Sequence, residues 1–315
     1  MRHLAVVCGP TASGKSQFAS ALAKQWNGVI INADALQVYR QLPIITASPT
    51  QEDRQLTKHF LYNHIDVWQD YSVARYISEV TQVLDSPDGQ NAIIVGGSGM
   101  YINSLIYGTH KLPSIDSDLR SNIRSEIELW GIANIYQKLQ KADSIGASKL
   151  NPHDSKRVSR AYEVFLQTGR SISSFYSDEN LYYPLEKYNI TTFYLCPERN
   201  FLYQNCNTRF EQFVEMGAID EAKKLLNNSS DFNITAKKAL GLQEIFNYLN
   251  GSLSLQEAIC IAQQKTRNFA KRQITWFSNQ LKDNHRVTFA TINEYYKELD
   301  CCARLLLKMP RGNLE

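Results

Sequence analysis

Apolar residues along this chain of 315 amino acids follow two alternating patterns. Short, continuous runs rich in Val and Ile are typical of strands that are buried on both faces of a parallel sheet. Between these runs, apolar residues recur every three or four positions, which is typical of amphipathic helices. The alternation predicts an α/β fold in which helices cover both faces of a parallel sheet.

Three of the apolar runs lie in the first hundred residues, and a fourth lies much later. They read HLAVVC (3–8), GVIINAD (28–34), NAIIVGG (91–97) and TTFYLCP (191–197). Helical patterns over residues 15–26 and 71–84 separate the first three runs. We expect all four strands to belong to one sheet.

The pattern changes between the third and fourth runs. Residues 116–186 show helical periodicity and several helix-capping residues, but few β-branched runs. We interpret this segment as a small, all-helical insertion domain. Residues 1–115 and 187–315 then form the core, whose final part after residue 198 is again helical.

The composition of the chain narrows the possible classes of protein but does not indicate a function. The chain is 43% hydrophobic and 21% charged, as in ordinary folded proteins, and its net charge of +3 means that any nucleic-acid surface must be a local patch. Its six cysteines contain no C-x-x-C pair, which predicts reduced thiols. No apolar stretch approaches the ~18 residues that a membrane helix requires. We expect a cytoplasmic protein, and a monomer is the simplest assembly.

The segment GPTASGKS directly follows the first apolar run. Its spacing matches G-x-x-x-x-G-K-[ST], the P-loop of nucleotide-binding proteins, including ATP-binding ones. Backbone N–H groups of such a loop form an anion nest, and the following helix directs its positive dipole end toward the phosphates. Lys15 then supplies a positive charge, and Ser16 supplies a hydroxyl ligand for Mg²⁺. The predicted phosphate site consists of Gly9, Pro10, Thr11, Ala12, Ser13, Gly14, Lys15 and Ser16.

A second motif of NTP-hydrolysing P-loop proteins is missing from the predicted strands. In those proteins an apolar strand ends in an Asp that orients Mg²⁺. Here the run 91–97 ends in Gly96 and Gly97, and only the run 28–34 ends in a carboxylate, Asp34. This difference favours a reaction in which phosphate binding serves a purpose other than NTP hydrolysis.

Asp34 has two interpretations. It lies beyond the carboxyl end of a predicted strand, where open α/β sheets bind their ligands. There it can act as a general base that removes a proton from a nucleophile beside a phosphorylated electrophile. It can equally be the N-cap of a helix over residues 35–40. Spacing alone leaves both interpretations open.

Basic residues gather in three helical segments of this nearly neutral chain. The last segment, QQKTRNFAKRQITWF (263–277), interleaves its cations with Phe269, Trp276 and Phe277. Each segment alone is compatible with an ordinary solvated helix face, but together they favour an RNA partner, because aromatic rings stack on unpaired bases. The basic residues are Lys156, Arg157, Arg160, Lys237, Lys238, Lys265, Arg267, Lys271 and Arg272.

In their order along the chain, these motifs resemble the tRNA dimethylallyltransferases of bacterial type, also called tRNA isopentenyltransferases. The resemblance covers nearly the whole chain and includes GPTASGKS, NADALQVYR, NHIDVW, DYSVARY, VGGSGMY, NPHDSKRVSRAYEVFLQTG, ALGLQE and TRNFAKRQITWF. It implies a P-loop NTPase-like core that transfers a dimethylallyl group from dimethylallyl diphosphate to the N6 amine of adenosine 37 in tRNA. Diphosphate is then the leaving group, and no NTP is required.

The resemblance also implies roles for residues at matching positions. Asp34 matches the general base, Lys15 and Mg²⁺ neutralise the departing diphosphate, and Arg209 matches an arginine beside it. The helical insertion matches a clamp on the anticodon stem-loop. Matching tRNA-contacting positions are Asp34, Ala35, Leu36, Gln37, Ser98, Arg120, Lys156, Arg157, Val158, Ser159 and Arg160. From the basic segments we add Lys238, Lys271 and Arg272 to the expected tRNA contacts.

Three positions depart from the family's pattern. Ala35 stands where the family usually has Ser, Ser48 where it tends to have Lys, and Leu242 where a Tyr is common. None of these changes removes Asp34 or the P-loop, so the implied reaction is retained.

Two other functions remain open from the sequence. A small-molecule or nucleotide kinase would use the same P-loop with ATP, but it leaves the basic, aromatic segment without a role. A non-enzymatic RNA-binding protein would account for that segment and leave the intact P-loop unexplained.

Overall fold

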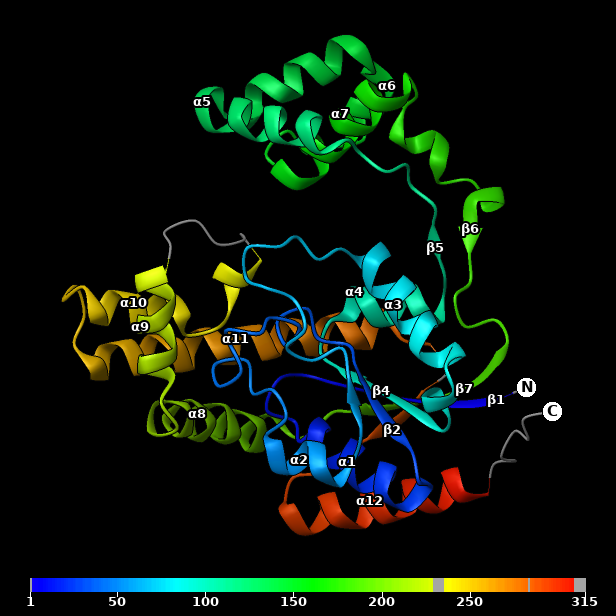
Figure 1. Ribbon diagram of the computed structural model, residues 1–315, viewed down its shortest axis with the longest axis vertical. Helices are drawn as coiled ribbons and strands as arrows, with labels where there is room; N and C mark the ends of the chain where they lie inside the picture. The colour runs from blue at the N-terminus through cyan, green and yellow to red at the C-terminus, as the bar shows by residue number, and fades with distance from the viewer. Residues whose placement is uncertain (1, 229–234, 283, 309–315) are drawn as a thin grey trace. The chain divides into compact units, whose positions relative to one another are not determined.

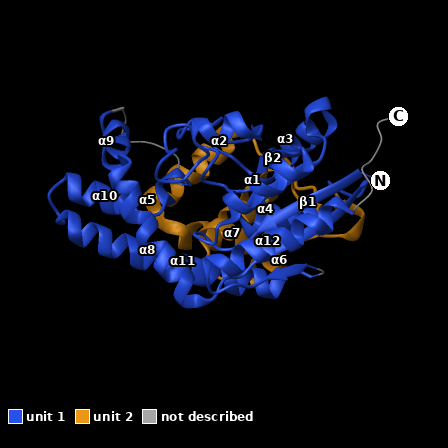
Figure 2. Ribbon diagram, turned by 90° about the horizontal axis from the view of Figure 1, so that it is seen from below, with its two compact units in different colours: residues 1–106, 184–315 blue, residues 107–183 orange. Residues whose placement is uncertain are grey.

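The structure is a computed structural model that describes residues 2–228, 235–282 and 284–308. The chain divides into two compact units (Figure 2). Unit 1 comprises Met1–Ile106 and Pro184–Glu315, and unit 2 comprises Tyr107–Tyr183. Among the described helices, none combines the length and the apolar character that a membrane crossing requires.

Unit 1 contains a six-stranded parallel sheet with the order β3-β2-β4-β1-β7-β8. Four strands coincide with the predicted runs: β1 (Arg2–Cys8), β2 (Val29–Asn32), β4 (Ala92–Gly96) and β7 (Tyr188–Leu195). The edge strands β3 (His59–Phe60) and β8 (His285–Val287) were not predicted, because they are too short to form an apolar run. The predicted α/β fold class with a parallel sheet is confirmed.

Helices cover both faces of this sheet (Figure 1). On one face, α1 (Lys15–Trp26) and α12 (Ile292–Leu307) share an apolar core with the sheet that includes Phe18, Leu22 and Leu299. The other face packs against α3 (Val73–Asp85), α4 (Gly99–Ile106) and α11 (Leu255–Gln280). An aromatic contact joins this helix layer to the sheet, because the ring centroids of Tyr194 in β7 and Phe277 in α11 are 5.6 Å apart.

Four further helices complete the described part of unit 1 apart from short 3-10 turns. They are α2 (Gln51–Leu56), α8 (Arg199–Glu215), α9 (Ala218–Asn228) and α10 (Leu242–Leu249). Figure 1 shows α8 beside α11, and α9 and α10 grouped at the end of this pair. Lys265 of α11 forms an ion pair with the buried Glu244 of α10, so this cation of the basic segment holds two helices together.

Unit 2 is mainly helical. Its helices are α5 (Ser117–Ala142), α6 (Ser144–Ser148) and α7 (Ser155–Thr168), which share a core around Ile135, Leu139 and Val164. A short antiparallel pair, β5 (Thr109–His110) with β6 (Leu181–Tyr182), lies at the two ends of its chain segment. The unit therefore spans Tyr107–Tyr183 and contains two strands, whereas the sequence predicted an all-helical domain over residues 116–186. The prediction missed the strands because segments of two residues leave no periodic pattern.

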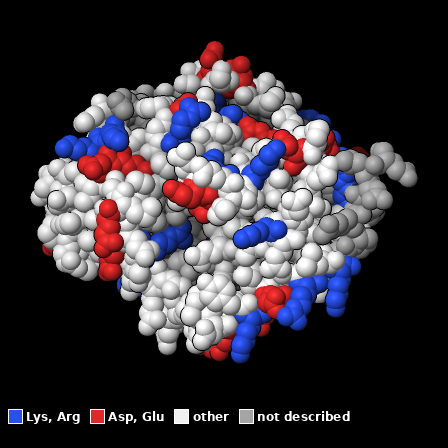
Figure 3. Space-filling model, turned by 60° about the horizontal axis from the view of Figure 1, so that its bottom comes forward, with Lys and Arg blue, Asp and Glu red and all other residues white. Residues whose placement is uncertain are grey.

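Basic and acidic side chains are mixed on one face of the molecule. On the face drawn in Figure 3, Lys and Arg lie interspersed with Asp and Glu, in keeping with the net charge of +3. Long-range attraction of a polyanion by this face is therefore weak.

Candidate functional site

The P-loop, residues 9–16, connects β1 to α1 at the carboxyl end of the sheet. Gly14 (φ 82°) and Ala12 (φ 62°) both adopt the left-handed conformation, which turns backbone N–H groups inward as an anion nest requires. A Cβ atom on Gly9 would lie 2.4 Å from the Leu195 carbonyl oxygen, so only glycine fits between β1 and β7 here. The loop thus has the conformation predicted from its sequence.

The side chains of Lys15, Ser13 and Ser16 place polar atoms where a ligand of the loop could bind. The Lys15 Nζ atom donates to the Pro10 carbonyl at 2.6 Å, and burial, followed by the charge of Arg209, lowers the pKa of Lys15 to about 8. The buried Ser13 Oγ has no hydrogen-bond partner among the described residues. Ser16 is exposed in the first turn of α1. A cation with no salt bridge among the described residues, an orphan hydroxyl and an exposed hydroxyl fit a phosphate ligand with its Mg²⁺, which takes few protein ligands and completes its shell with phosphate and water oxygens.

Helix α8 contacts the P-loop through two side chains. The Arg209 Nη1 atom lies 3.4 Å from Thr11 Oγ1, and Asn205 Nδ2 donates to the Ala12 carbonyl at 3.3 Å. Burial lowers the pKa of Arg209, whereas it raises the pKa of the neighbouring Cys206 to about 11. The site therefore holds two cations close to the nest and a thiol that stays protonated at neutral pH.

Asp34 follows β2 at the same edge of the sheet and is half-buried. Its Oδ1 atom accepts the N–H of Leu36 at 2.9 Å, but residues 35–40 form turns and no helix. The interpretation of Asp34 as a helix N-cap is therefore wrong. Its negative charge raises the pKa of both Lys15 and Arg209 against the effect of burial, so the structure brings these three groups together.

Two residues fix the backbone around this carboxylate. The fully buried Asn32 accepts the Asp34 N–H at 2.8 Å and donates to the carbonyls of Asp34 and Leu61, both at 2.9 Å. The Ser98 Oγ atom accepts the Ala35 N–H at 2.8 Å. Asn32 was missed in the sequence because a polar residue at the end of a strand resembles an ordinary turn residue.

Buried tyrosines lie near Asp34 on the side of α3 and α4. Tyr76 and Tyr101 stack with ring centroids 4.1 Å apart. Burial, with a smaller contribution from the Asp34 charge, raises the pKa of Tyr62, Tyr76 and Tyr101 well above the usual range. These phenols remain neutral, so they add aromatic surface and no charge of their own to this side of the site.

The residues of unit 1 that were predicted to contact tRNA have different environments. Ala35 and Leu36 are partly exposed beside Asp34, and Lys238 is exposed in a turn over Ala236–Lys238. The Gln37 Nε2 atom donates to the carbonyls of Thr46 and Ala47 at 3.0 and 2.7 Å, so its amide group holds a loop. On α11, Lys271 and Arg272 are exposed, and the Arg272 guanidinium lies 5.5 Å from the Phe269 ring centroid.

The residues of unit 2 that were predicted to contact tRNA lie on α5 and α7. Glu163, nearly buried, pairs with both Arg120 (3.8 Å) and Arg160 (3.5 Å), and Arg160 also donates to the Pro113 carbonyl. On the exposed face, Arg157 pairs with its neighbour Asp154, next to the exposed Lys156 and the partly exposed Ser159. The prediction that Val158 contacts tRNA is wrong, because its side chain is fully buried in the core of the unit.

The three departures from the family's pattern have different surroundings. Ala35 is held through its backbone, as described above. The Ser48 Oγ atom accepts from Asn63 at 3.1 Å, and Leu242 is fully buried at the start of α10.

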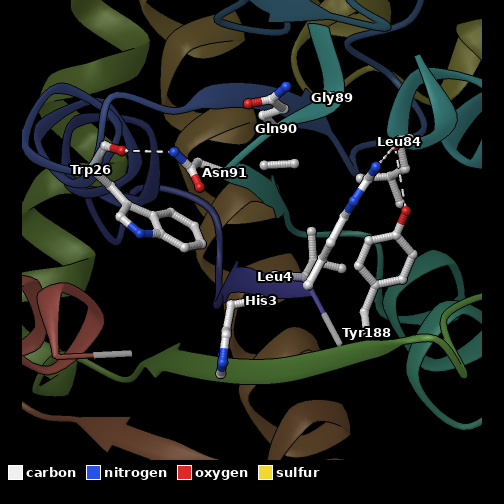
Figure 4. Close-up of a pocket in the computed structure, with 10 residues that line it drawn as sticks. His3, Leu4, Trp26, Leu84, Gly89, Gln90, Asn91 and Tyr188 are labelled. Carbon is white, nitrogen blue, oxygen red and sulfur yellow. Dashed lines mark hydrogen bonds between the residues drawn. The ribbon is translucent and has the colours of Figure 1, made fainter. Parts of the chain in front are cut away.

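A small pocket lies at the opposite, amino-terminal end of the strands (Figure 4). His3 and Leu4 of β1, Trp26 of α1 and Tyr188 of β7 line it, and Asn91 donates to the Trp26 carbonyl at 3.1 Å. Ligands of open α/β sheets bind at the carboxyl ends of the strands. This pocket is therefore not the ligand site that the fold predicts.

Taken together, the parallel sheet and the nest define a P-loop phosphate-binding protein with a carboxylate beside the loop. The family model described as IPP transferase matches residues 37–280. The chain therefore belongs to the IPP transferase family.

Curated relatives match the chain over nearly its whole length. A tRNA dimethylallyltransferase of Rickettsia rickettsii is 42% identical over 308 residues, covering 95% of this chain and 82% of the relative. Another, from Orientia tsutsugamushi, is 40% identical over 337 residues, covering 94% of this chain and 97% of the relative.

Solved structures are similar over the same extent. A crystal structure of the full-length tRNA isopentenylpyrophosphate transferase of Bacillus halodurans is 31% identical, with a TM-score of 0.68, and the match covers 98% of this chain and 96% of that one. A eukaryotic dimethylallyltransferase, captured acting on tRNA, shares the fold at a TM-score of 0.81 and 24% identity, over 99% of this chain and 81% of that one.

Proposed function

We propose that the protein transfers the dimethylallyl group of dimethylallyl diphosphate to the exocyclic N6 amine of adenosine 37 in tRNA and releases diphosphate. The observation that carries this proposal is the arrangement of charged groups around the anion nest that contains Lys15. Arg209 lies 3.4 Å from Thr11 Oγ1 of the loop, and a Cβ atom on Gly97 would lie 3.4 Å from Asp34 Oδ2 and 3.5 Å from the Gly9 carbonyl oxygen. The names of the curated relatives support the same activity.

In this proposal the P-loop binds the leaving group. Backbone N–H groups of residues 14–16 and the cations of Lys15 and Arg209 stabilise the charge that grows on diphosphate as its bond to the allylic carbon breaks. Ser16 would hold a Mg²⁺ ion, which would supply further positive charge to the diphosphate oxygens.

Asp34 acts on the other substrate. The exocyclic amine of adenine is a weak nucleophile, because its lone pair is delocalised into the ring. As N6 forms its bond to the allylic carbon, one N6 proton passes to the Asp34 carboxylate, and the electron pair of the broken C–O bond leaves with diphosphate. Asn32 and Ser98 keep Asp34 in place during this step.

The acceptor adenosine must leave the stack of the anticodon loop to reach Asp34. The exposed cations on α7 and α11, Lys156, Arg157, Lys271 and Arg272, are proposed to bind phosphates of the anticodon stem-loop. We also propose that the enzyme acts as a monomer in the cytoplasm. The P-loop, Asp34 and Arg209 come from a single chain, and the six cysteines are free thiols, as in reducing compartments.

A direct assay tests the proposal. The protein is incubated with Mg²⁺, dimethylallyl diphosphate and unmodified tRNA, and we expect release of diphosphate together with the addition of one five-carbon group to the tRNA. Formation of ADP from ATP, with no prenylation of tRNA, would contradict the proposal and assign the P-loop to a kinase.

A further inference from the structure

One side chain of α11 connects the P-loop directly to the end of β4. The Thr11 N–H donates to Gln273 Oε1, and Gln273 Nε2 donates to the Gly97 carbonyl, both at 2.8 Å. Gln273 is 7% exposed, so water competes little for either hydrogen bond. The residue belongs to the segment 263–277, which sequence analysis associated only with RNA.

The orientation of this amide is determined by its partners. Thr11 offers a donor and Gly97 an acceptor, so turning the amide around would place two donors together at one end and two acceptors at the other. A hydrocarbon, a carboxylate or a shorter amide at position 273 cannot make both bonds. The position therefore requires a glutamine for a geometric reason.

Gly97 lies at the meeting point of the site's parts. A Cβ atom on Gly97 would lie 2.6 Å from Gln273 Nε2, 3.4 Å from Asp34 Oδ2 and 3.5 Å from the Gly9 carbonyl oxygen. The absence of a side chain here lets Gln273 approach the strand end next to Asp34. This close approach explains the glycine at position 97, whereas a Cβ atom on Gly96 would lie 2.0 Å from the Ala33 carbonyl oxygen.

The two atoms that Gln273 holds belong to the two halves of the proposed reaction. Thr11 is part of the nest, and its Oγ1 also meets Arg209. Gly97 is adjacent to Ser98, whose hydroxyl holds the backbone beside Asp34. A shift of Gln273 would therefore change the separation between the nest and the carboxylate.

We propose that Gln273 is a positioning residue that sets the distance between the diphosphate in the P-loop and the amine activated by Asp34. The inference rests on the proposed prenyl transfer. Gln273 contacts neither the reacting carbon nor N6 in this proposal, and it acts through Thr11 and Gly97. Because reacting atoms must approach within a narrow range, an error of about 1 Å in such a distance costs on the order of a hundredfold in rate.

Two nearly isosteric variants test the inference. Gln273→Met removes both hydrogen bonds while conserving length, and Gln273→Glu retains only the acceptor for Thr11. Gln256, an exposed glutamine in the first turn of the same helix, provides matched controls as Gln256→Met and Gln256→Glu. All are compared by single-turnover prenylation with saturating enzyme, because an unfolded fraction then leaves the rate constant of the bound complex unchanged.

We expect Gln273→Met to lower the single-turnover rate constant about a hundredfold. Gln273→Glu should lower it less, and the Gln256 variants should match the wild type. Affinities for inorganic pyrophosphate and for tRNA should stay within about threefold of the wild type, because the nest and the RNA surface remain. Rate constants within twofold of the wild type for both Gln273 variants would overturn the inference, as would a loss confined to pyrophosphate affinity. If the wild type itself transfers no prenyl group, the proposed function fails instead.

Discussion

The candidate residues at the strand ends of unit 1 and those along α7 of unit 2 are held in opposite ways. In unit 1, Asp34 and the P-loop are fixed by buried partners such as Asn32 and Gln273, through hydrogen bonds of 2.8–2.9 Å. In unit 2, Lys156 and Arg157 are exposed, and Arg157 has only a neighbouring surface carboxylate.

This difference corresponds to two physical tasks. A reacting group must be held within a fraction of an ångström before the substrate arrives, which requires buried and fully paired supports. A phosphate contact needs only an accessible cation, and it acts largely by releasing counterions from the RNA. Mutations in the two regions should therefore differ in size and in their dependence on salt.

The largest effect is expected at the carboxylate. Asp34→Asn should lower turnover by about a thousandfold or more, because the amide cannot accept the N6 proton. Binding of tRNA, measured by filter retention, should persist. Asp88→Asn, at an exposed position beyond the far end of the sheet, is the control and should be fully active. Unchanged turnover in Asp34→Asn would reduce Asp34 to the Asx turn it forms with Leu36.

Lys15 should make anion binding sensitive to pH. Burial lowers the pKa of Lys15 to about 8, so in the free protein its charge is present below this pH and is lost above it. The affinity for inorganic pyrophosphate, measured by calorimetry, should gain a weakening contribution of up to about tenfold per pH unit above pH 8. Lys15→Met should lack this contribution, and subtraction of its profile removes the ionisation of pyrophosphate itself. Parallel profiles for the two proteins would show that Lys15 does not titrate there.

Stability should respond to the same group with the opposite sign. The folded protein holds fewer protons at Lys15 than the unfolded chain between pH 8 and the usual lysine pKa, so the free energy of unfolding should rise with pH in this window. This contribution should also be absent from Lys15→Met.

Glu163 is expected to have a structural role, because it forms ion pairs within unit 2. Glu163→Gln leaves Arg120 and Arg160 without their shared carboxylate, and we expect a loss of about 1–2 kcal/mol in the free energy of unfolding of unit 2. The single-turnover rate at saturating tRNA should be unchanged, because no group of the P-loop site is altered. A large fall in that rate without a change in stability would place Glu163 in the reaction.

The smallest effect is expected at a single exposed cation. Lys271→Ala should weaken tRNA binding a few-fold at low salt and make the slope of log affinity against log salt shallower by about 0.7–0.9. Lys24→Ala, in the last turn of α1, is the matched control and should leave the slope unchanged. Equal slopes for wild type and Lys271→Ala would show that this part of α11 only faces solvent.

Much of this architecture follows from the sequence. Long apolar runs predicted the four central strands, and the helix over residues 15–26 has the predicted bounds. Strands of two or three residues, such as β3 and β5, leave no periodic pattern and were missed. The helix that one interpretation placed after Asp34 does not form, because Asn32, which also bonds the Leu61 carbonyl, and Ser98 hold that segment in turns through partners that are distant in sequence.

The chemical site was predictable only in part. The motif identified the P-loop, because its spacing directly encodes the backbone conformation. Gln273 was not identified, since a glutamine on an amphipathic helix resembles a surface residue until its partners, 262 and 176 positions away, are known. Arg209 entered only through the family resemblance, for the same reason.

The most direct test of the central claim is to map the product of the reaction. Unmodified tRNA is incubated with dimethylallyl diphosphate and either the wild type or Asp34→Asn, and the digested nucleosides and oligonucleotides are identified by mass spectrometry. The account predicts a prenyl group on N6 of adenosine 37 with the wild type and almost none with the variant. A prenyl group elsewhere, or equal yields from both proteins, would contradict it.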